Sequence, residues 1–207
     1  IGGKMGPTLG RMVVRAAEAA GTPRRVIGVS RFSDATAREA LEAHGIETIA
    51  CDLLDEAKVA DLPDCPNVIY LAGLKFGSTG NAALTWAMNT HLPSIVARRF
   101  AGSRIVAFSS GNVYGLKPVT GGGARETDPT DPVGEYAMSC VGRERIFEHF
   151  SRTDSIPTAI IRLNYAVELR YGVLLDLAEQ VRTGQPIDVS MGNMNVIWQA
   201  DANAMTI

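Results

Sequence analysis

Two hydroxyl groups and a thiol are spaced along this sequence in a way that could serve proton transfer. Ser110 follows the apolar, strand-like run at residues 104–108, and Tyr136 opens a later segment with apolar residues at helical spacing. On a helix, Cys140 lies one turn after Tyr136 and Arg143 lies two turns after it. A serine at a strand end and a tyrosine on the next helix can face one carbonyl or alcohol oxygen. The pattern therefore indicates a hydride-transfer or proton-transfer site.

The elements that must position these residues alternate between strands and helices along the chain. Short apolar runs predict strands at residues 25–29, 46–50, 68–73, 104–108 and 157–163. Helical patterns fill the intervals between them. This alternation predicts an α/β fold with a doubly wound parallel sheet. Open sheets of this kind bind ligands at the carboxyl ends of their strands, so the residues that follow each strand are candidate contacts.

A glycine turn near the start of the chain leads into a predicted helix. Pro7 suits the first turn of a helix, and an apolar stripe continues to Gly21, a plausible stop. Backbone N–H groups and the helix dipole both favour an anion at such an N-terminus. We expect the turn to bind a phosphate through Gly3, Lys4, Met5 and Gly6.

These motifs resemble the extended short-chain dehydrogenase/reductase superfamily, and within it the NAD(P)-dependent epimerase/dehydratase family. The family places a Ser or Thr four residues before the tyrosine of a Val-Tyr-Gly segment, and that position here is Ser110. The tyrosine of the family's Tyr-x-x-x-Lys motif corresponds to Tyr136. The resemblance implies a Rossmann fold in which Ser110 holds the reacting oxygen and Tyr136 exchanges its proton.

The lysine position of that motif holds Cys140. In the family the lysine ammonium stabilises a tyrosinate and hydrogen-bonds the nicotinamide ribose. A cysteine is neutral near pH 7 unless activated, and it is a weak donor. Some other cation must supply the charge. Arg143 on the same helical face and Lys75 from a neighbouring strand end are candidates, and a water or the positive nicotinamide ring are alternatives.

The family's glycine motif is Gly-x-x-Gly-x-x-Gly, and Gly3 and Gly6 fit its second and third glycines. We therefore expect the chain to start within the motif, with the first strand missing. We expect residues 1–163 to form the dinucleotide-binding domain, incomplete at its N-terminus. Residues 164–207 would form the start of a substrate-binding lobe, interleaved with the sheet and incomplete at its C-terminus.

The end of the strand at residues 25–29 bears on the choice of cofactor. NAD-preferring members of such folds usually place an acidic residue there to bind the ribose 2′-hydroxyl. This chain has Ser30 and Arg31, a pair that suits a 2′-phosphate. We therefore expect NADP, with NAD as the alternative and a merely solvent-exposed Arg31 as the alternative interpretation. The resemblance places further cofactor contacts at Asp52, Leu53, Ala72, Gly73, Lys75 and Asn89.

Substrate contacts are expected at the same edge of the sheet. Asn112 follows Ser110 closely, and Asn164 with Tyr165 follows the strand at residues 157–163. Three glycines at 121–123 indicate a mobile loop that could cover a substrate.

The composition argues against several classes of partner. The 207 residues carry a net charge of −2 and 46% hydrophobic residues, which gives no basic surface for nucleic acid or a membrane. The three histidines are isolated and the three cysteines lack metal-ligand spacing, so no metal site is expected. An odd number of cysteines without a disulfide pattern suits the reducing cytoplasm. By resemblance, we also expect a homodimer.

Two functions remain open. The first is an NAD(P)-dependent enzyme of the epimerase, dehydratase or reductase type, acting on a hydroxy or carbonyl compound such as a nucleotide sugar. The second is a non-catalytic dinucleotide-binding redox sensor or regulatory protein, which the missing lysine favours. Ser110 and Tyr136, both retained, favour the enzyme.

Overall fold

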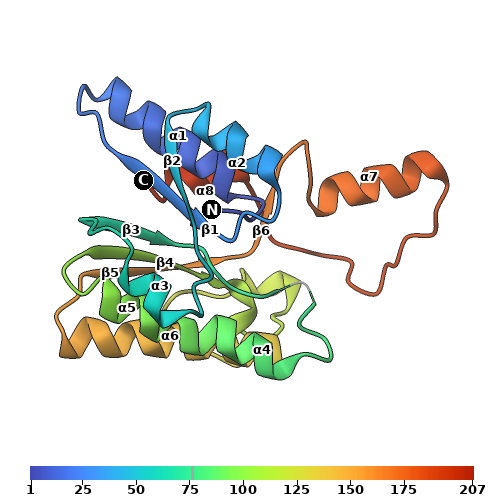
Figure 1. The fold of residues 1–207 in the computed structure, drawn as a ribbon. Coiled ribbons are helices and arrows are strands. Elements are labelled where there is room, and N and C mark those ends of the chain that lie inside the picture. Colours follow the sequence, from blue (N-terminus) through green and yellow to red (C-terminus); the bar gives the residue numbers. More distant parts are fainter. Residues whose placement is uncertain (76) are drawn as a thin grey trace.

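Parallel strands form the middle of the molecule, and helices cover them on both sides (Figure 1). The computed structural model describes residues 1–75 and 77–207. The strands are β1 (Val26–Ser30), β2 (Ile46–Ala50), β3 (Asn67–Tyr70), β4 (Arg104–Ser110), β5 (Thr158–Leu163), β6 (Tyr165–Val167) and β7 (Val196–Trp198). They pair as β1–β2, β3–β4–β5 and β6–β7, with every pair parallel. The predicted parallel α/β fold is confirmed.

The helices divide into two layers, as in a doubly wound fold. They are α1 (Gly6–Ala19), α2 (Ala35–Glu42), α3 (Glu56–Ala60), α4 (Ala82–Trp86), α5 (Leu92–Arg99), α6 (Gly134–Thr153), α7 (Val173–Thr183) and α8 (Gln199–Ala204). In Figure 1, α1, α2 and α8 lie above the strands, and α3, α4, α5 and α6 lie below them. The helices thus change face between β2 and β3, which is where open sheets bind ligands.

The glycine turn packs tightly against β1. The backbone nitrogen of Ile1 donates to the carbonyl oxygen of Val29 at 3.0 Å, so the first residue runs beside the strand. A Cβ on Gly6 would lie 2.0 Å from the carbonyl oxygen of Ile1, a distance that excludes any side chain there. Pro7 occupies the first turn of α1, as predicted. Among the described residues, no ladder hydrogen bonds join the β1–β2 pair to β3.

A π-helical turn separates α4 from α5. Pro93 predicts a break near residues 89–92, and the structure has the π turn at Ala87–His91 with Pro93 in the first turn of α5. A π turn carries one extra residue per turn, and such turns are frequent at functional sites. Here the turn contains Asn89, whose side chain is completely buried.

The lower helices close the larger core. Phe147 of α6 packs edge-on against Tyr70 of β3, with ring centroids 5.1 Å apart. Leu92 of α5, Ile105 of β4 and Ile156 are also almost wholly buried in this cluster. This packing fixes α6, and therefore Tyr136, against the ends of β3 and β4.

Residues 164–207 contain two differently packed parts. Helix α7 has no buried residue and projects from the body of the molecule in Figure 1. Helix α8 instead returns to α1, where Gln199 and Asn203 both donate to the hydroxyl of Thr8. None of the described helices is both long and apolar enough to cross a lipid bilayer.

Candidate active site

Ser110, Tyr136 and Cys140 meet in space, as the sequence predicts. Ser110 ends β4, is 5% exposed, and accepts a hydrogen bond from the backbone nitrogen of Asn112 at 3.2 Å. Tyr136 lies in the first turn of α6, where its hydroxyl interacts with the side chains of Ser110 and Cys140. A strand end and a helix start thus bring two hydroxyls together at one point.

Burial controls the acidity of Tyr136. It raises the pKa of the phenol to about 12, and the neighbouring Cys140 thiol adds to this rise. A hydrogen bond with Ser110 and the charge of Arg143 act in the opposite direction. The phenol is therefore protonated near neutral pH.

Cys140 is a buried, neutral thiol. Its exposed fraction is 0%, and burial is the main cause of its raised pKa. The charges of Arg143 and Lys75 and the hydrogen bond with Tyr136 lower the pKa, whereas Glu144 raises it. A protonated thiol with no surface access is a poor nucleophile, so Cys140 does not make a second reactive centre.

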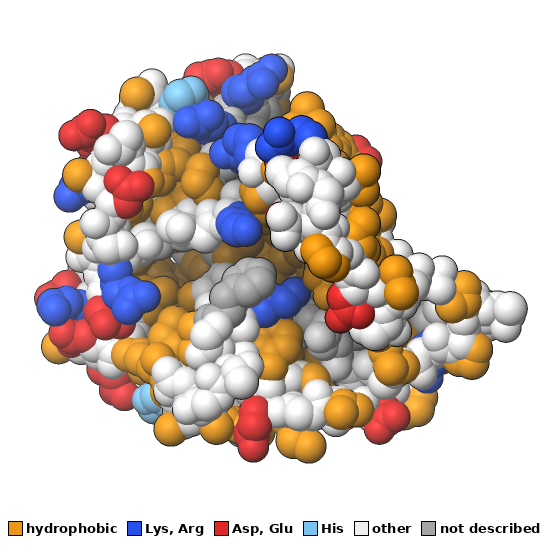
Figure 2. Space-filling view, turned by 90° about the vertical axis from the view of Figure 1, so that its right-hand side faces the viewer, with side chains coloured by type: hydrophobic (Ala, Val, Ile, Leu, Met, Phe, Trp, Pro, Cys, Tyr) orange, Lys and Arg blue, Asp and Glu red, His pale blue; other side chains and the backbone are white. Residues whose placement is uncertain are grey.

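Lys75 lies at the same site although it comes from the segment after β3. Its Nζ is 4.7 Å from the centroid of the Tyr165 ring. Partial desolvation lowers the pKa of this exposed ammonium, and the electrostatic influence of Cys140 raises it. Figure 2 faces this side of the molecule and shows Lys and Arg side chains, in blue, around a hollow.

Asn89 connects the segment after β3 to helix α6. Its Oδ1 accepts from the backbone nitrogen of Leu74 at 2.7 Å, and its Nδ2 donates to the Leu74 carbonyl at 3.0 Å. The same Nδ2 donates to the hydroxyl of Ser139 at 2.9 Å. The sequence predicts Asn89 as a cofactor contact, whereas the structure directs its side chain into these internal bonds.

Arg143 is a buried cation that no carboxylate contacts among the described residues. Its Nη1 donates to the Phe108 carbonyl at 2.8 Å, its Nη2 donates to Asn89 Oδ1 at 2.6 Å, and its Nε points to the Asn89 carbonyl at 3.4 Å. A Cβ on Gly73 would lie 2.3 Å from the Arg143 Nη2. Glycine is therefore needed at position 73 because of this guanidinium, a reason that the sequence did not reveal.

The predicted dinucleotide contacts converge at the ends of β1, β2 and β3. A Cβ on Gly2 would lie 2.3 Å from the Ser30 Oγ, so the glycine turn abuts the end of β1. The Ser30 carbonyl accepts from the backbone nitrogen of Cys51 at 2.9 Å, which brings Asp52 to the same edge. A Cβ on Gly3 would meet no atom within 4 Å, so a ligand can approach the backbone there.

The residues predicted to contact a dinucleotide at this edge differ in their exposure to solvent. The carboxylate of Asp52 accepts from the backbone nitrogen of Leu54 at 3.1 Å, and Leu53 is half-buried beside it. Arg31 is exposed just beyond β1, and Ala72 is half-buried beyond β3. These positions, with the glycine turn, have room and donors for a dinucleotide.

The predicted substrate contacts border Ser110. A Cβ on Gly111 would lie 1.9 Å from Asn164 Oδ1, so the amide of Asn164 packs against the turn after β4. Asn112 and Tyr165 are exposed beside it. The structure thus brings Asn112, Asn164 and Tyr165 to the same edge as Ser110.

An ion pair between half-buried Arg162 and buried Glu144 lies behind the serines and was not predicted from the sequence. Arg162 of β5 donates to both carboxylate oxygens of Glu144, including an Nη2–Oε2 contact of 2.8 Å. Ser109 donates to the same carboxylate at 2.5 Å, and Arg162 also donates to the hydroxyl of Tyr114. The only sequence signal for this pair is that Glu144 and Arg162, which have opposite charges, stand at interior positions of a predicted helix and a predicted strand.

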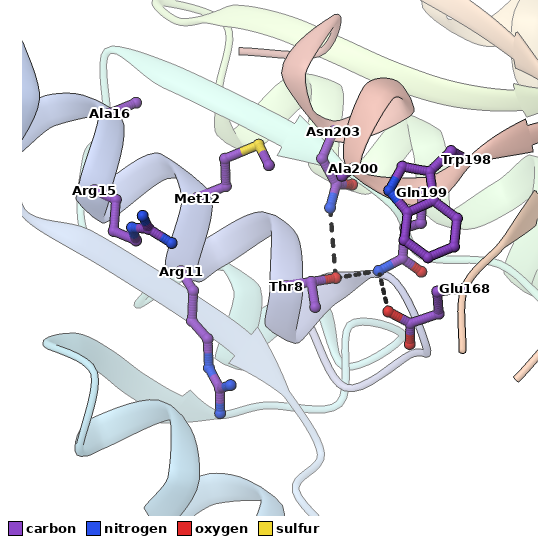
Figure 3. Close-up of a pocket in the computed structure, with 10 residues that line it drawn as sticks. All are labelled: Thr8, Arg11, Met12, Arg15, Ala16, Glu168, Trp198, Gln199, Ala200 and Asn203. Carbon is purple, nitrogen blue, oxygen red and sulfur yellow. Dashed lines mark hydrogen bonds between the residues drawn. The ribbon is translucent and has the colours of Figure 1, made fainter. Parts of the chain in front are cut away.

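A separate cavity of about 500 Å³ lies between α1 and the segment around α8 (Figure 3). It is bordered by Thr8, Arg11 and Arg15 from α1 and by Trp198 and Asn203 around α8. None of the predicted site residues lines it. Because hydrogen bonds from Gln199 and Asn203 to Thr8 cross its floor, we attribute it to the packing of α8 on α1.

Comparisons with known proteins agree with this architecture. Residues 7–191 match a family model described as the NAD dependent epimerase/dehydratase family. A search among curated proteins found no match.

Solved structures share the fold at low sequence identity. A double mutant of DesIV, a dTDP-glucose 4,6-dehydratase from Streptomyces venezuelae, is 17% identical with a TM-score of 0.82, covering 98% of this chain and 67% of that one. A UDP-glucuronic acid 4-epimerase mutant from Bacillus cereus is 18% identical with a TM-score of 0.77, covering 97% and 68%. A UDP-glucose 4-epimerase from Thermotoga maritima is 16% identical with a TM-score of 0.77, covering 96% and 68%.

Proposed function

This chain belongs to the NAD dependent epimerase/dehydratase family, and on that premise we propose that it binds a nicotinamide dinucleotide and catalyses hydride transfer on a hydroxy or carbonyl substrate. The observation that carries the proposal is the meeting of Ser110 and Tyr136 at the carboxyl edge of the sheet. The glycine turn and the strand ends beside it have the open backbone and the donors that a dinucleotide requires. When bound, the dinucleotide supplies the hydride donor or acceptor.

The chain's own residues would position the substrate and move one proton. The Ser110 hydroxyl would donate a hydrogen bond to the reacting oxygen, and the Tyr136 phenol would give its proton to that oxygen in reduction. A phenol whose pKa is raised to about 12 is a weaker acid than an ordinary tyrosine, but it keeps its proton at neutral pH, whereas the tyrosinate that oxidation needs as a base is almost unpopulated. Reduction is therefore the direction that the tyrosine favours in the absence of an added positive charge.

We propose a nucleotide sugar as the substrate. The support is the fold shared with enzymes whose names specify UDP-glucose, UDP-glucuronic acid or dTDP-glucose. Asn112, Asn164 and Tyr165 would provide amide and phenol groups for sugar hydroxyls. Residues 164–207 would then contribute to the substrate side of the site, and residues 1–163 to the dinucleotide side.

Tyr136→Phe is the direct test of the proposed chemistry. The assay would offer UDP-glucose, UDP-glucuronic acid and dTDP-glucose and would follow the absorbance of the reduced nicotinamide and the sugar products. The variant should lose about 10²–10⁴-fold in rate, the usual contribution of general acid–base catalysis, while dinucleotide affinity changes little. Unchanged turnover in the variant would remove Tyr136 from the mechanism.

We propose NADP as the preferred dinucleotide, with NAD as the alternative. The support is the exposed guanidinium of Arg31 next to Ser30, at the strand end where a 2′-phosphate would lie. Calorimetric titration should show tighter binding of NADPH than of NADH, and Arg31→Ala should remove the difference. Arg24→Ala, at an exposed position before β1, is the matched control. Equal affinity for the two dinucleotides in the wild-type protein would contradict the preference.

The second candidate function is a non-catalytic dinucleotide sensor. The observation in its favour is Cys140, a neutral buried thiol where the motif has a lysine. Tight dinucleotide binding without turnover of any nucleotide sugar or simple carbonyl compound would select this function over the enzyme.

We also propose a cytoplasmic homodimer. Leu84 and Trp86 of α4 and Met138 of α6 are partly exposed on adjoining helices, and a second copy could cover them. Cys51, Cys65 and Cys140 are free thiols, which suits a reducing compartment. Analytical ultracentrifugation of the wild-type chain and of a Trp86→Lys variant would test the dimer.

A further inference from the structure

The end of β4 and the turn after it, residues 109–114, carry side chains that the proposed mechanism places next to the substrate. Ser110 and Asn112 lie inside this segment, and the Ser110 hydroxyl exchanges hydrogen bonds with the Asn112 backbone nitrogen and side chain at 3.2 Å each. The pairing of β4 with β5 ends at Ser110, and a short 3-10 turn at Gly111–Val113 follows. The contacts that hold the two ends of the segment therefore decide where Ser110 and Asn112 lie.

The first end of the segment is held by helix α6. The hydroxyl of Ser109 donates to a carboxylate oxygen of Glu144 at 2.5 Å, and both residues are buried. Glu144 lies about two turns after Tyr136 on this helix. The helix that carries the phenol thus also holds the residue directly before Ser110.

The second end of the segment is held by strand β5. Arg162 donates to the hydroxyl of Tyr114, and its guanidinium carbon lies 4.9 Å from the centroid of the Tyr114 ring. The same nitrogen reaches the Glu126 carbonyl at 3.3 Å, so the loop that follows the segment shares this donor. Arg162 is also the partner of Ser109 in the pairing of β5 with β4. One side chain therefore stands beside both ends of the segment.

The two residues that hold these ends form one ion pair. Arg162 donates to the two carboxylate oxygens of Glu144 through Nε at 3.0 Å and Nη2 at 2.8 Å. A buried ion pair seldom stabilises a protein more than apolar side chains of similar volume would, because desolvating both charges offsets their attraction. The planar guanidinium can, however, contact a carboxylate and a phenol at once in fixed directions, which an ammonium cannot do. The pair is therefore better suited to fixing positions than to adding stability.

We propose that Glu144 and Arg162 are positioning residues for the proposed reaction, in which they clamp both ends of residues 109–114 and so set the Ser110 hydroxyl against Tyr136. The inference rests on the proposed hydride-transfer function. In this role neither charged residue contacts the substrate or takes up a proton. The clamp acts only through the hydroxyls at the two ends of the segment.

Those two hydroxyls can be removed one at a time while the ion pair stays in place. The assay uses Ser109→Ala and Tyr114→Phe in the full chain, with whichever of UDP-glucose, UDP-glucuronic acid and dTDP-glucose the wild type turns over. Each variant should lower kcat about 10- to 100-fold, because a displacement of about 1 Å at a reacting group costs this much. The dinucleotide Kd should change little, since the expected dinucleotide contacts lie at the ends of β1, β2 and β3.

Ser103→Ala is the matched control for a lost buried hydroxyl. Ser103 directly precedes β4 at its opposite end, and its hydroxyl donates to the Cys65 carbonyl at 2.5 Å. Ser103→Ala and Ser109→Ala should lose stability to a similar extent in urea denaturation, because each removes one hydrogen bond from a buried serine. Only Ser109→Ala should lose kcat.

Arg162→Lys tests the fork of the guanidinium itself. The variant keeps a cation beside Glu144, but its single ammonium cannot hold the carboxylate and the Tyr114 phenol in the same directions. It should therefore lower kcat to the same extent as Tyr114→Phe, again with little change in the dinucleotide Kd.

The outcomes distinguish the clamp from the proposed function. If the wild type is active and Ser109→Ala, Tyr114→Phe or Arg162→Lys keeps its kcat, the clamp is wrong and the proposed function stands. An equal loss of kcat in Ser103→Ala, or a parallel loss of dinucleotide affinity, would also overturn the clamp, because it would indicate a general disturbance of the fold. If the wild type turns over none of the three nucleotide sugars, the proposed function fails and the clamp fails with it.

Discussion

Two consecutive residues of α6 carry opposite charges into opposite parts of the protein. Arg143 extends toward β4 and the π turn before α5, where the Phe108 carbonyl and the Asn89 side chain accept its hydrogen bonds. Glu144 extends toward β5, where Arg162 donates to both of its carboxylate oxygens. Both side chains are buried, at 7% and 1% exposure.

The difference lies in how each charge is compensated. Arg162 compensates the charge of Glu144, although this carboxylate still raises the pKa of the Cys140 thiol. Arg143 is hydrogen-bonded without being neutralised, so its positive charge acts on Tyr136 and Cys140 and lowers both pKa values. The ion pair therefore joins α6 to β5, whereas the arginine without a carboxylate partner lies where its positive charge acts on the protons of Tyr136 and Cys140.

The ion pair should give the largest loss of stability. Glu144→Ala leaves the Arg162 guanidinium and the Ser109 hydroxyl without their acceptor, and breaking a buried pair from one side costs about 3–5 kcal/mol. Urea denaturation of the full chain measures this loss. Glu148→Ala, which removes a solvent-exposed pair with Arg145 on the same helix, should cost about 0–1 kcal/mol. Similar costs for the two variants would contradict the assigned role.

The packing of the Arg143 guanidinium can be probed through Gly73, which lies against it. Gly73→Ala should cost about 1–3 kcal/mol because the new Cβ would lie 2.3 Å from Arg143 Nη2 and displace it. In an Arg143→Met background part of that cost should vanish because a thioether chain can move aside, whereas Asn89 Oδ1, 2.9 Å from the new Cβ, remains. A double-mutant cycle by urea denaturation measures the coupling. Additive effects would show that Gly73 is required for another reason.

A smaller effect is expected at the hydroxyl that links the two segments. Ser139→Ala removes one hydrogen bond with Asn89 and one with the Tyr136 carbonyl, and should cost about 0.5–1.5 kcal/mol. Asn89 keeps its bonds to Leu74, so the network should persist. Thermal unfolding gives the size of the loss. A cost as large as that of Glu144→Ala would mean that this network, rather than the ion pair, holds α6 in place.

The smallest effect at neutral pH concerns the ionisation of Tyr136. Its pKa is raised from 10.0 to about 12 in the folded chain, so folding favours the protonated phenol. The stability from this preference is complete below pH 10 and is lost as the pH rises through 12. Wild type and Tyr136→Phe, compared by denaturation across this interval, should differ in slope, with the variant losing less stability. Parallel curves would show that the phenol is not desolvated as described.

Local patterns were enough to predict the order of the elements and the chemistry at the strand ends. The parallel α/β fold, the break near Pro93, and the approach of Ser110 to Tyr136 all follow from periodicity, proline chemistry and the family motif. A cap is decided by backbone angles at the helix start, which the sequence does not show. The sequence predicts Ser33 as the cap of the helix that follows it, and this is wrong: Asp34 caps α2 by accepting from the backbone nitrogen of Thr36 at 2.9 Å.

The tertiary structure alone decided which charges face the site. Arg143 and Asn89 are 54 residues apart in the chain, and Arg162 is 18 residues from Glu144, so no local pattern joins them. Asn89 joins the segment after β3 to α6 through Leu74 and Ser139, and the charge of Lys75 acts on Cys140. The sequence by itself determined that a cation was missing from its usual position. Long-range packing determined which cations lie near Tyr136 and Cys140. A side chain that loses its water to neighbouring residues must find a polar partner, and that partner can be distant in the sequence.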